Sequence, residues 1–164
     1  MLASISMALE LGFNQEQIQL SLNNYKAMFG RAEKTKIKGH DAIIQLIKNP
    51  TGASEVLKTV DLKSHILIAI NDNFADGRDV SWLWDAEFEL LKNTQYEIIT
   101  SGIRANDMAL RLKYAGVEKE KIKVIMDLTK AVKYVAENCQ NDEKISILPT
   151  YTALLEIKEK KGKV

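Results

Sequence analysis

The stretch Ser64-His-Ile-Leu-Ile-Ala-Ile70 constrains the fold of this chain more than any other feature. A short, continuous apolar run is typical of a strand that is buried on both faces, as in parallel sheets covered by helices. The run ends in a polar segment that begins at Asn71. We therefore predict a buried strand here, with Ile66, Ile68 and Ile70 in the core and Asp76 exposed in a loop beyond its carboxyl end.

Helical and strand-like segments alternate from Ala53 onward. This order implies an α/β fold with a doubly wound, mostly parallel sheet, of the Rossmann-like kind. Two further strands precede the alternation, around a turn at Lys38-Gly39. The pattern predicts strands at 33–37, 41–47, 64–70, 96–100, 121–126 and 144–148, and helices at 53–60, 82–92, 105–114, 130–138 and 152–160.

The amino-terminal residues read as two helices with no sheet to pack on. Gly12 ends the first helix, and Asn14 with Gln17 three residues later forms a capping-box pattern that starts the second. We place the domain boundary near Phe29-Gly30-Arg31. Residues 1–29 are then a helical remnant, upstream residues having been removed, and residues 30–164 are a separate α/β domain.

Composition excludes several classes of protein. Lys plus Arg number 23 and Asp plus Glu 22, so the count gives no basic face for nucleic acid or for a membrane surface. Cys139 is the only cysteine, which rules out an internal disulfide and favours a reducing, cytoplasmic location. The apolar residues at the start of the chain include Glu10 and lack a positively charged region, so they do not resemble a signal peptide. No apolar stretch is long enough to span a bilayer.

The loop Asn71–Asp79 is the densest cluster of chemical groups. Ligands of open α/β sheets bind beyond the carboxyl ends of the strands, and here Asp72, Asp76 and Asp79 follow one strand. Arg78 is available to pair with a carboxylate, and the two tryptophans of the chain, Trp82 and Trp84, adjoin the loop. Aromatic anchors beside charges are typical of protein interfaces.

Blander interpretations of this loop remain open. Asp79 or Ser81 caps the following helix in the simplest of them. A metal site is weakly supported, because clustered aspartates lack a histidine or a phosphate motif beside them.

Other segments carry less chemistry. Lys48-Asn49-Pro50-Thr51-Gly52 is either a phosphate contact through Lys48 and the following helix, or a plain turn. No GxxxxGK[ST], GxSxG or HExxH motif is present. Cys139 lies near a predicted helix end, His40 in a turn and His65 at a strand start. We interpret the histidines as structural or exposed rather than catalytic, which argues against a Cys-His nucleophile within this chain.

Several segments together resemble the Mur ligase superfamily, and within it the Mur-ligase-like subunit of bacterial lipid II isoglutaminyl synthase. Phe29-Gly30-Arg31-Ala32-Glu33 resembles the hinge that enters the carboxyl-terminal domain of Mur ligases. The string Asp76-Gly-Arg-Asp-Val-Ser-Trp82 is long and unusual, so its match is specific. The resembling segments of the branch are 46–52, 70–85, 101–116 and 148–155.

The resemblance implies a two-subunit enzyme. Its ligase subunit uses ATP and Mg²⁺ to activate the α-carboxyl of D-glutamate in lipid II, at the inner face of the cell membrane. A glutamine amidotransferase subunit, forming a heterodimer with it, supplies ammonia. The phosphate loop and the four-cysteine zinc ribbon of the family's central domain are absent from this sequence, so the chain alone is expected to be inactive and to bind neither ATP nor metal.

The resemblance also implies roles for single residues. The partner's Cys-His pair takes its acidic third member from the ligase subunit, and Asp76 matches that acid best, with Asp72 and Asp79 as alternatives. A triad needs such an acid to fix the imidazole tautomer and stabilise its cation. Arg31 and Asn49 are expected to line the nucleotide site, and Arg78, Asp79 and Trp82 to contact the partner.

Two rival interpretations come from other classes. A phospho-receiver module is also doubly wound, but it needs a lysine after the last strand, where this chain has Leu148-Pro149-Thr150. A stand-alone nucleotide-binding or scaffold domain without a catalytic role is the second. Capture by an amidotransferase, as opposed to a nucleotide column, discriminates between them.

Overall fold

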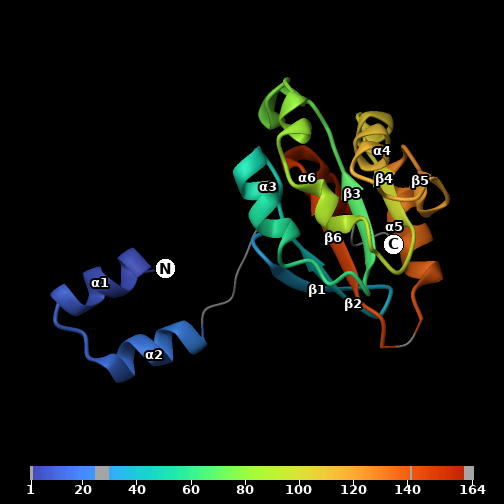
Figure 1. The fold of residues 1–164 in the computed structure, drawn as a ribbon. Coiled ribbons are helices and arrows are strands. Elements are labelled where there is room, and N and C mark those ends of the chain that lie inside the picture. Colours follow the sequence, from blue (N-terminus) through green and yellow to red (C-terminus); the bar gives the residue numbers. More distant parts are fainter. Residues whose placement is uncertain (1, 25–29, 141, 161–164) are drawn as a thin grey trace.

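The computed structural model describes residues 2–24, 30–140 and 142–160, and its centre is a six-stranded sheet (Figure 1). The strand order is β1-β2-β6-β3-β4-β5. β1 and β2 pair in antiparallel fashion at one edge, and all other neighbours are parallel. The strands are β1 (Glu33–Ile37), β2 (His40–Ile44), β3 (His65–Ala69), β4 (Ile98–Ser101), β5 (Ile122–Val124) and β6 (Ile145–Pro149). The predicted fold class is confirmed.

Helices cover both faces of this sheet. α5 and α6 bury one side and α3 and α4 the other, each over its own apolar cluster. β3 alternates between the two clusters: Leu67 and Ala69 face the first, whereas Ile66 and Ile68 face the second. The helices are α1 (Leu2–Glu10), α2 (Gln15–Asn23), α3 (Pro50–Leu57), α4 (Ala105–Tyr114), α5 (Leu128–Asn138) and α6 (Tyr151–Lys160).

The central strand behaves as its sequence predicts. Ile66, Ile68 and Ile70 have no exposed surface, because β6 and β4 flank β3 and helices cover its two faces. The strand at 33–37 and the helix at 105–114 have the predicted bounds. The other predicted elements of the α/β unit, except the helix at 82–92, appear with ends shifted by a few residues.

The predicted helix at 82–92 is wrong. Two short 3-10 helices replace it, η2 (Ser81–Trp84) and η3 (Phe88–Leu91). The guanidinium of Arg111 donates hydrogen bonds to the carbonyl oxygens of Leu83 and Ala86, each at 2.8 Å. The N–H of Glu87 donates to Ser54 Oγ. These tertiary bonds use backbone groups that a continuous helix would pair internally.

The two amino-terminal helices lie apart from the sheet (Figure 1) and bury none of their own residues. The capping box is confirmed: Asn14 Oδ1 accepts from the N–H of Gln17, and Gln17 Oε1 accepts from the N–H of Asn14. Phe29, where the boundary is predicted, lies outside the described residues. Within the described part of the chain, no helix combines the length and the apolar character needed to cross a membrane.

Candidate functional site

The carboxyl ends of β3, β4 and β6 meet at one edge of the sheet, and Asn71 joins them. Its N–H donates to Thr150 Oγ1 at 2.9 Å, and its side-chain oxygen accepts from the N–H of Ile103 at 3.0 Å. Gly102 passes so close that a Cβ there would lie 2.6 Å from the Ile70 carbonyl oxygen, and its φ is +87°. Only glycine fits this approach, which explains the Ser101-Gly102 pair after β4.

Asp76 is the most constrained carboxylate of the acidic loop. It ends η1 (Phe74–Asp76) and is 8% exposed. Oδ1 accepts the N–H of Thr152 at 2.8 Å, and Oδ2 accepts the Thr152 hydroxyl at 2.6 Å and the N–H of Asn73 at 3.1 Å. This side chain therefore helps to fix the loop after β3 to the start of α6.

Our expectation that Asp76 is exposed is wrong, although its position beyond the strand is right. The sequence shows only that a polar residue follows the strand. Thr152, which contributes two of the three donors, is distant in sequence, and its hydroxyl also accepts from the side-chain amides of Asn71 and Asn73. A buried carboxylate needs such partners, and here they come from α6.

Asp72 forms an ion pair with Arg104 at the carboxyl end of the sheet. Its Oδ2 lies 2.7 Å from Arg104 Nη2 and 2.9 Å from Arg104 Nε, a two-pronged ion pair. This pairing raises the pKa of the Arg104 guanidinium. Asp72 is therefore occupied as an ion-pair partner at the start of α4.

Asp79 is exposed and caps a turn. Its Oδ1 accepts the N–H of Ser81 at 2.8 Å, and this bond holds the pKa of the carboxyl below its usual range. The capping interpretation is not confirmed: the N-cap of η2 is Val80 and makes no side-chain cap bond, so the Asp79 bond closes a local turn before this element. Arg78 is exposed, and its predicted pairing with a carboxylate is not found among the residues that the structure describes.

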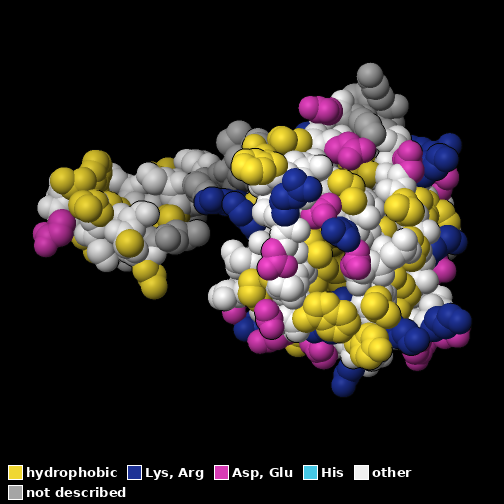
Figure 2. Space-filling model, turned by 90° about the horizontal axis from the view of Figure 1, so that it is seen from above, with side chains coloured by type: hydrophobic (Ala, Val, Ile, Leu, Met, Phe, Trp, Pro, Cys, Tyr) yellow, Lys and Arg dark blue, Asp and Glu magenta, His cyan; other side chains and the backbone are white. Residues whose placement is uncertain are grey.

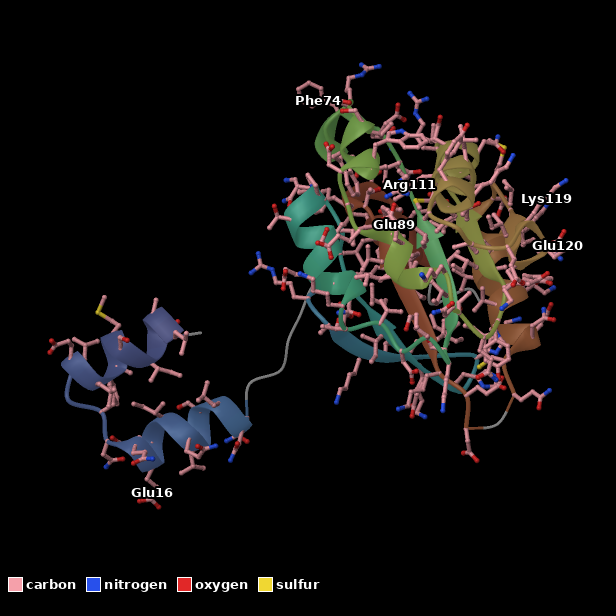
Figure 3. All side chains as sticks on the ribbon, viewed as in Figure 1. Glu16, Phe74, Glu89, Arg111, Lys119 and Glu120 are labelled. Atoms are coloured by element: carbon pink, nitrogen blue, oxygen red, sulfur yellow. The ribbon has the colours of Figure 1, made fainter. Side chains whose placement is uncertain are left out.

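Large apolar side chains are exposed around this edge. Phe74 is 91% exposed and projects outward from η1 (Figure 3). Trp84 packs edge-on against Tyr114 of α4, with ring centroids 5.6 Å apart, and both are more than half exposed. Trp82 is half-buried against the core instead. Figure 2, a view from above, shows hydrophobic side chains interspersed with charges of both signs.

Arg111 supports this aromatic surface from below. It is 4% exposed, bonds the two backbone carbonyls described above and meets Glu89 Oε1 at 2.8 Å (Figure 3). Its guanidinium also lies over the rings of Trp84 and Phe88 at 5.7 and 5.6 Å. The sequence does not reveal this role, because a lone arginine in a helix carries no signal of burial.

The predicted nucleotide-site residues are not part of the acidic loop. Arg31 is exposed just before β1. Asn49 caps α3, where its side-chain oxygen accepts the N–H of Gly52 at 2.8 Å. The N–H of Ile47, two residues earlier, donates to the carbonyl oxygen of Pro149 at the end of β6, so Asn49 lies at the same carboxyl end of the sheet as the acidic loop.

Comparison with known proteins identifies the family of this chain. Residues 46–154 match the family described as MurT ligase C-terminal. The chain is 36% identical over 162 residues to the Streptococcus pneumoniae lipid II isoglutaminyl synthase (glutamine-hydrolyzing) subunit MurT, covering 96% of this chain and 36% of that protein. It is 38% identical over 157 residues to the Staphylococcus aureus subunit of the same name, covering 93% and 35%. The chain thus spans about a third of these relatives.

Solved structures of ligases share the fold. MurF from Acinetobacter baumannii superposes with a TM-score of 0.59 at 20% identity, over 98% of this chain and 35% of that one. UDP-N-acetylmuramate-alanine ligase MurC from Thermotoga maritima gives 0.62 at 12% identity, over 99% and 36%. The family match covers most of the α/β unit and includes the acidic loop and Thr152. The chain therefore belongs to the MurT ligase C-terminal family.

Proposed function

We propose that this chain is the carboxyl-terminal part of the ligase subunit of a lipid II isoglutaminyl synthase. In this proposal the complete enzyme amidates the α-carboxyl of D-glutamate in lipid II, using ATP and ammonia from glutamine. The observation that carries the proposal is the match of residues 46–154 to the family, together with relatives that bear this activity in their names. The division at residue 29 into a remnant of a central ATPase domain and this domain is part of the same proposal.

The role proposed for this domain is to dock a glutamine amidotransferase subunit. The relatives are named as subunits of a glutamine-hydrolysing enzyme, so a second polypeptide is a natural occupant of the exposed edge. Phe74, Trp84 and Tyr114 offer large exposed rings, and Arg78 and Asp79, which lie between Phe74 and Trp84 in the chain, offer exposed charges. Aromatic and arginine side chains contribute most to the binding energy of such interfaces.

We further propose that Asp76 completes the partner's Cys-His site. A triad acid has to hold an imidazole in one tautomer, which calls for a fixed carboxylate. Asp76 is fixed by three hydrogen bonds, whereas Asp72 is committed to Arg104 and Asp79 lies on an exposed turn. A carboxylate oxygen has two acceptor positions, so Oδ1 keeps one for an imidazole N–H after bonding Thr152.

We propose a nucleotide role for Arg31 and Asn49. In the complete enzyme, ATP with Mg²⁺ would bind mainly in the central domain, which would also carry the zinc ribbon. Arg31 and Asn49 would then approach the nucleotide as the domains close. Asn49 keeps its amide N–H groups for a phosphate oxygen, since only its oxygen is used in capping α3.

Phe74→Ala tests the docking proposal. The ring is 91% exposed, so its removal should leave the melting temperature unchanged while weakening binding to the amidotransferase about tenfold or more, which corresponds to about 1.4 kcal/mol. Calorimetric titration of the two purified subunits measures the change. Leu11→Ala, at a site 69% exposed before α2, is the matched control. Equal affinity for both variants would place the interface elsewhere.

A further inference from the structure

A second cluster of reactive side chains lies at the opposite edge of the sheet from the acidic loop. His65 begins β3, Cys139 follows α5, and Glu143 lies in the turn before β6. One ligand atom from each of these three residues lies within 4.8 Å of the others. Nitrogen, sulfur and carboxylate oxygen thus converge from three separate elements.

The cluster is largely buried and lies beside a cavity. Cys139 is 7% and His65 8% exposed, and Glu143 is half-buried. His65 Nε2 lies 2.8 Å from Glu143 Oε2. His65 and Glu143, but not Cys139, line the cavity of about 180 Å³, together with Tyr96 and others.

Tyr96 orients both the imidazole and the carboxylate. Its ring stacks on His65 with centroids 4.1 Å apart and an interplanar angle of 11°, and its hydroxyl donates to Glu143 Oε1. The N–H of Gln140 donates to Glu143 Oε2 at 2.7 Å. These bonds hold the pKa of the Glu143 carboxyl at about 2, so it is an anion at neutral pH. Metal sites are commonly preorganised by outer partners of this kind.

We propose that His65, Cys139 and Glu143 bind one divalent transition-metal ion of the Zn²⁺ class. Zn²⁺ prefers this mixture of imidazole, thiolate and carboxylate, and its ligand atoms stand about 3.3–3.6 Å apart around a tetrahedral centre. The three ligand atoms lie within 4.8 Å of one another, and His65 Nε2 and Glu143 Oε2, which share a hydrogen bond of 2.8 Å, would move apart to hold the ion between them. A water molecule in the neighbouring cavity would supply the fourth ligand.

The same residues do not form a nucleophilic site. Cys139 is buried, whereas a nucleophilic cysteine has to be reached by its substrate. His65 directs Nε2 at the carboxylate, and the cluster lies at the amino ends of the parallel strands, away from the edge where α/β folds bind substrates. The ion would therefore be structural, fastening the α5–β6 turn to β3.

Cobalt titration of the metal-free 164-residue chain tests the site. Co²⁺ occupies such sites and gives a thiolate-to-metal charge-transfer band in the near ultraviolet. We expect one Co²⁺ per chain with this band, and its displacement by Zn²⁺. Cys139→Ser should abolish the band, and Tyr96→Phe should weaken Zn²⁺ binding by about tenfold or more, the effect of losing an outer partner.

The chain offers a matched histidine control. The wild-type chain and His40→Gln should bind alike, because His40 lies outside the cluster, whereas His65→Gln and Glu143→Gln should lose at least about tenfold in affinity. The wild-type spectrum decides the matter even if a variant fails to fold. Absence of the charge-transfer band at stoichiometric Co²⁺, or equal loss in His40→Gln and His65→Gln, would overturn the proposal and leave the cluster as a hydrogen-bond network.

Discussion

Replacing Asp76 by Asn in the two-subunit complex is expected to lower glutamine hydrolysis at least about a hundredfold. The substitution removes the charge that stabilises an imidazolium and favours the wrong tautomer, a change that costs about ten-thousandfold in a serine-protease triad. Turnover of glutamine to glutamate, measured at saturating partner, gives the size of the loss. Ammonia supplied directly should restore amidation, since in this account the ligase chemistry takes place elsewhere.

The buried setting of Asp76 requires a structural control. Its three partners all donate, so an amide nitrogen in place of one oxygen would face a donor and loosen the loop. Thr152→Val removes the three bonds of the Thr152 hydroxyl, to Asp76, Asn71 and Asn73, but keeps the carboxylate and its bond from the Thr152 N–H. If Thr152→Val loses as much glutaminase activity as Asp76→Asn, the effect is structural. Asp72→Asn and Asp79→Asn should be milder, and a larger loss in either would transfer the role to that residue.

Arg111→Met is expected to destabilise the domain by about 3 kcal/mol. The buried guanidinium satisfies the carbonyl oxygens of Leu83 and Ala86, and each buried acceptor left without a partner costs about 1–3 kcal/mol. Methionine keeps the apolar stem, so the loss reports the hydrogen bonds rather than a cavity. Urea unfolding followed by circular dichroism measures the free energy of unfolding.

Arg78→Met provides the matched control, because it makes the same substitution at an exposed site. Its effect should stay within about 0.5 kcal/mol. A loss of less than about 1 kcal/mol in Arg111→Met would show that water replaces the guanidinium. η2 and η3 would then owe their geometry to other contacts.

The fold could be predicted from the sequence because its signals are local. The apolar run of β3 and the regular alternation after Ala53 each follow from burial on both faces of a sheet. The prediction of a helix at 82–92 is wrong because Arg111 and Ser54, which bond the backbone of this segment, are distant from it in the chain. Helical propensity alone carries no information about such competition.

The sequence predicts where the acidic loop lies but not the contacts of its side chains. The aspartates follow β3 as expected, but the burial of Asp76 depends on Thr152, at the far end of the chain. The His65, Cys139 and Glu143 cluster was missed for the same reason. Its members have no motif spacing, and only the adjacency of β3 and β6 brings them together.

Titrating the isolated amidotransferase subunit with the 164-residue chain, without ATP, tests the central claim most directly. The account predicts that glutamine hydrolysis rises to a plateau with the wild-type chain. The Asp76→Asn chain should bind with similar affinity yet give less than about a hundredth of that rate. Equal stimulation by both chains, or no stimulation when the wild-type chain is fully bound, would contradict the claim that this domain supplies a catalytic carboxylate.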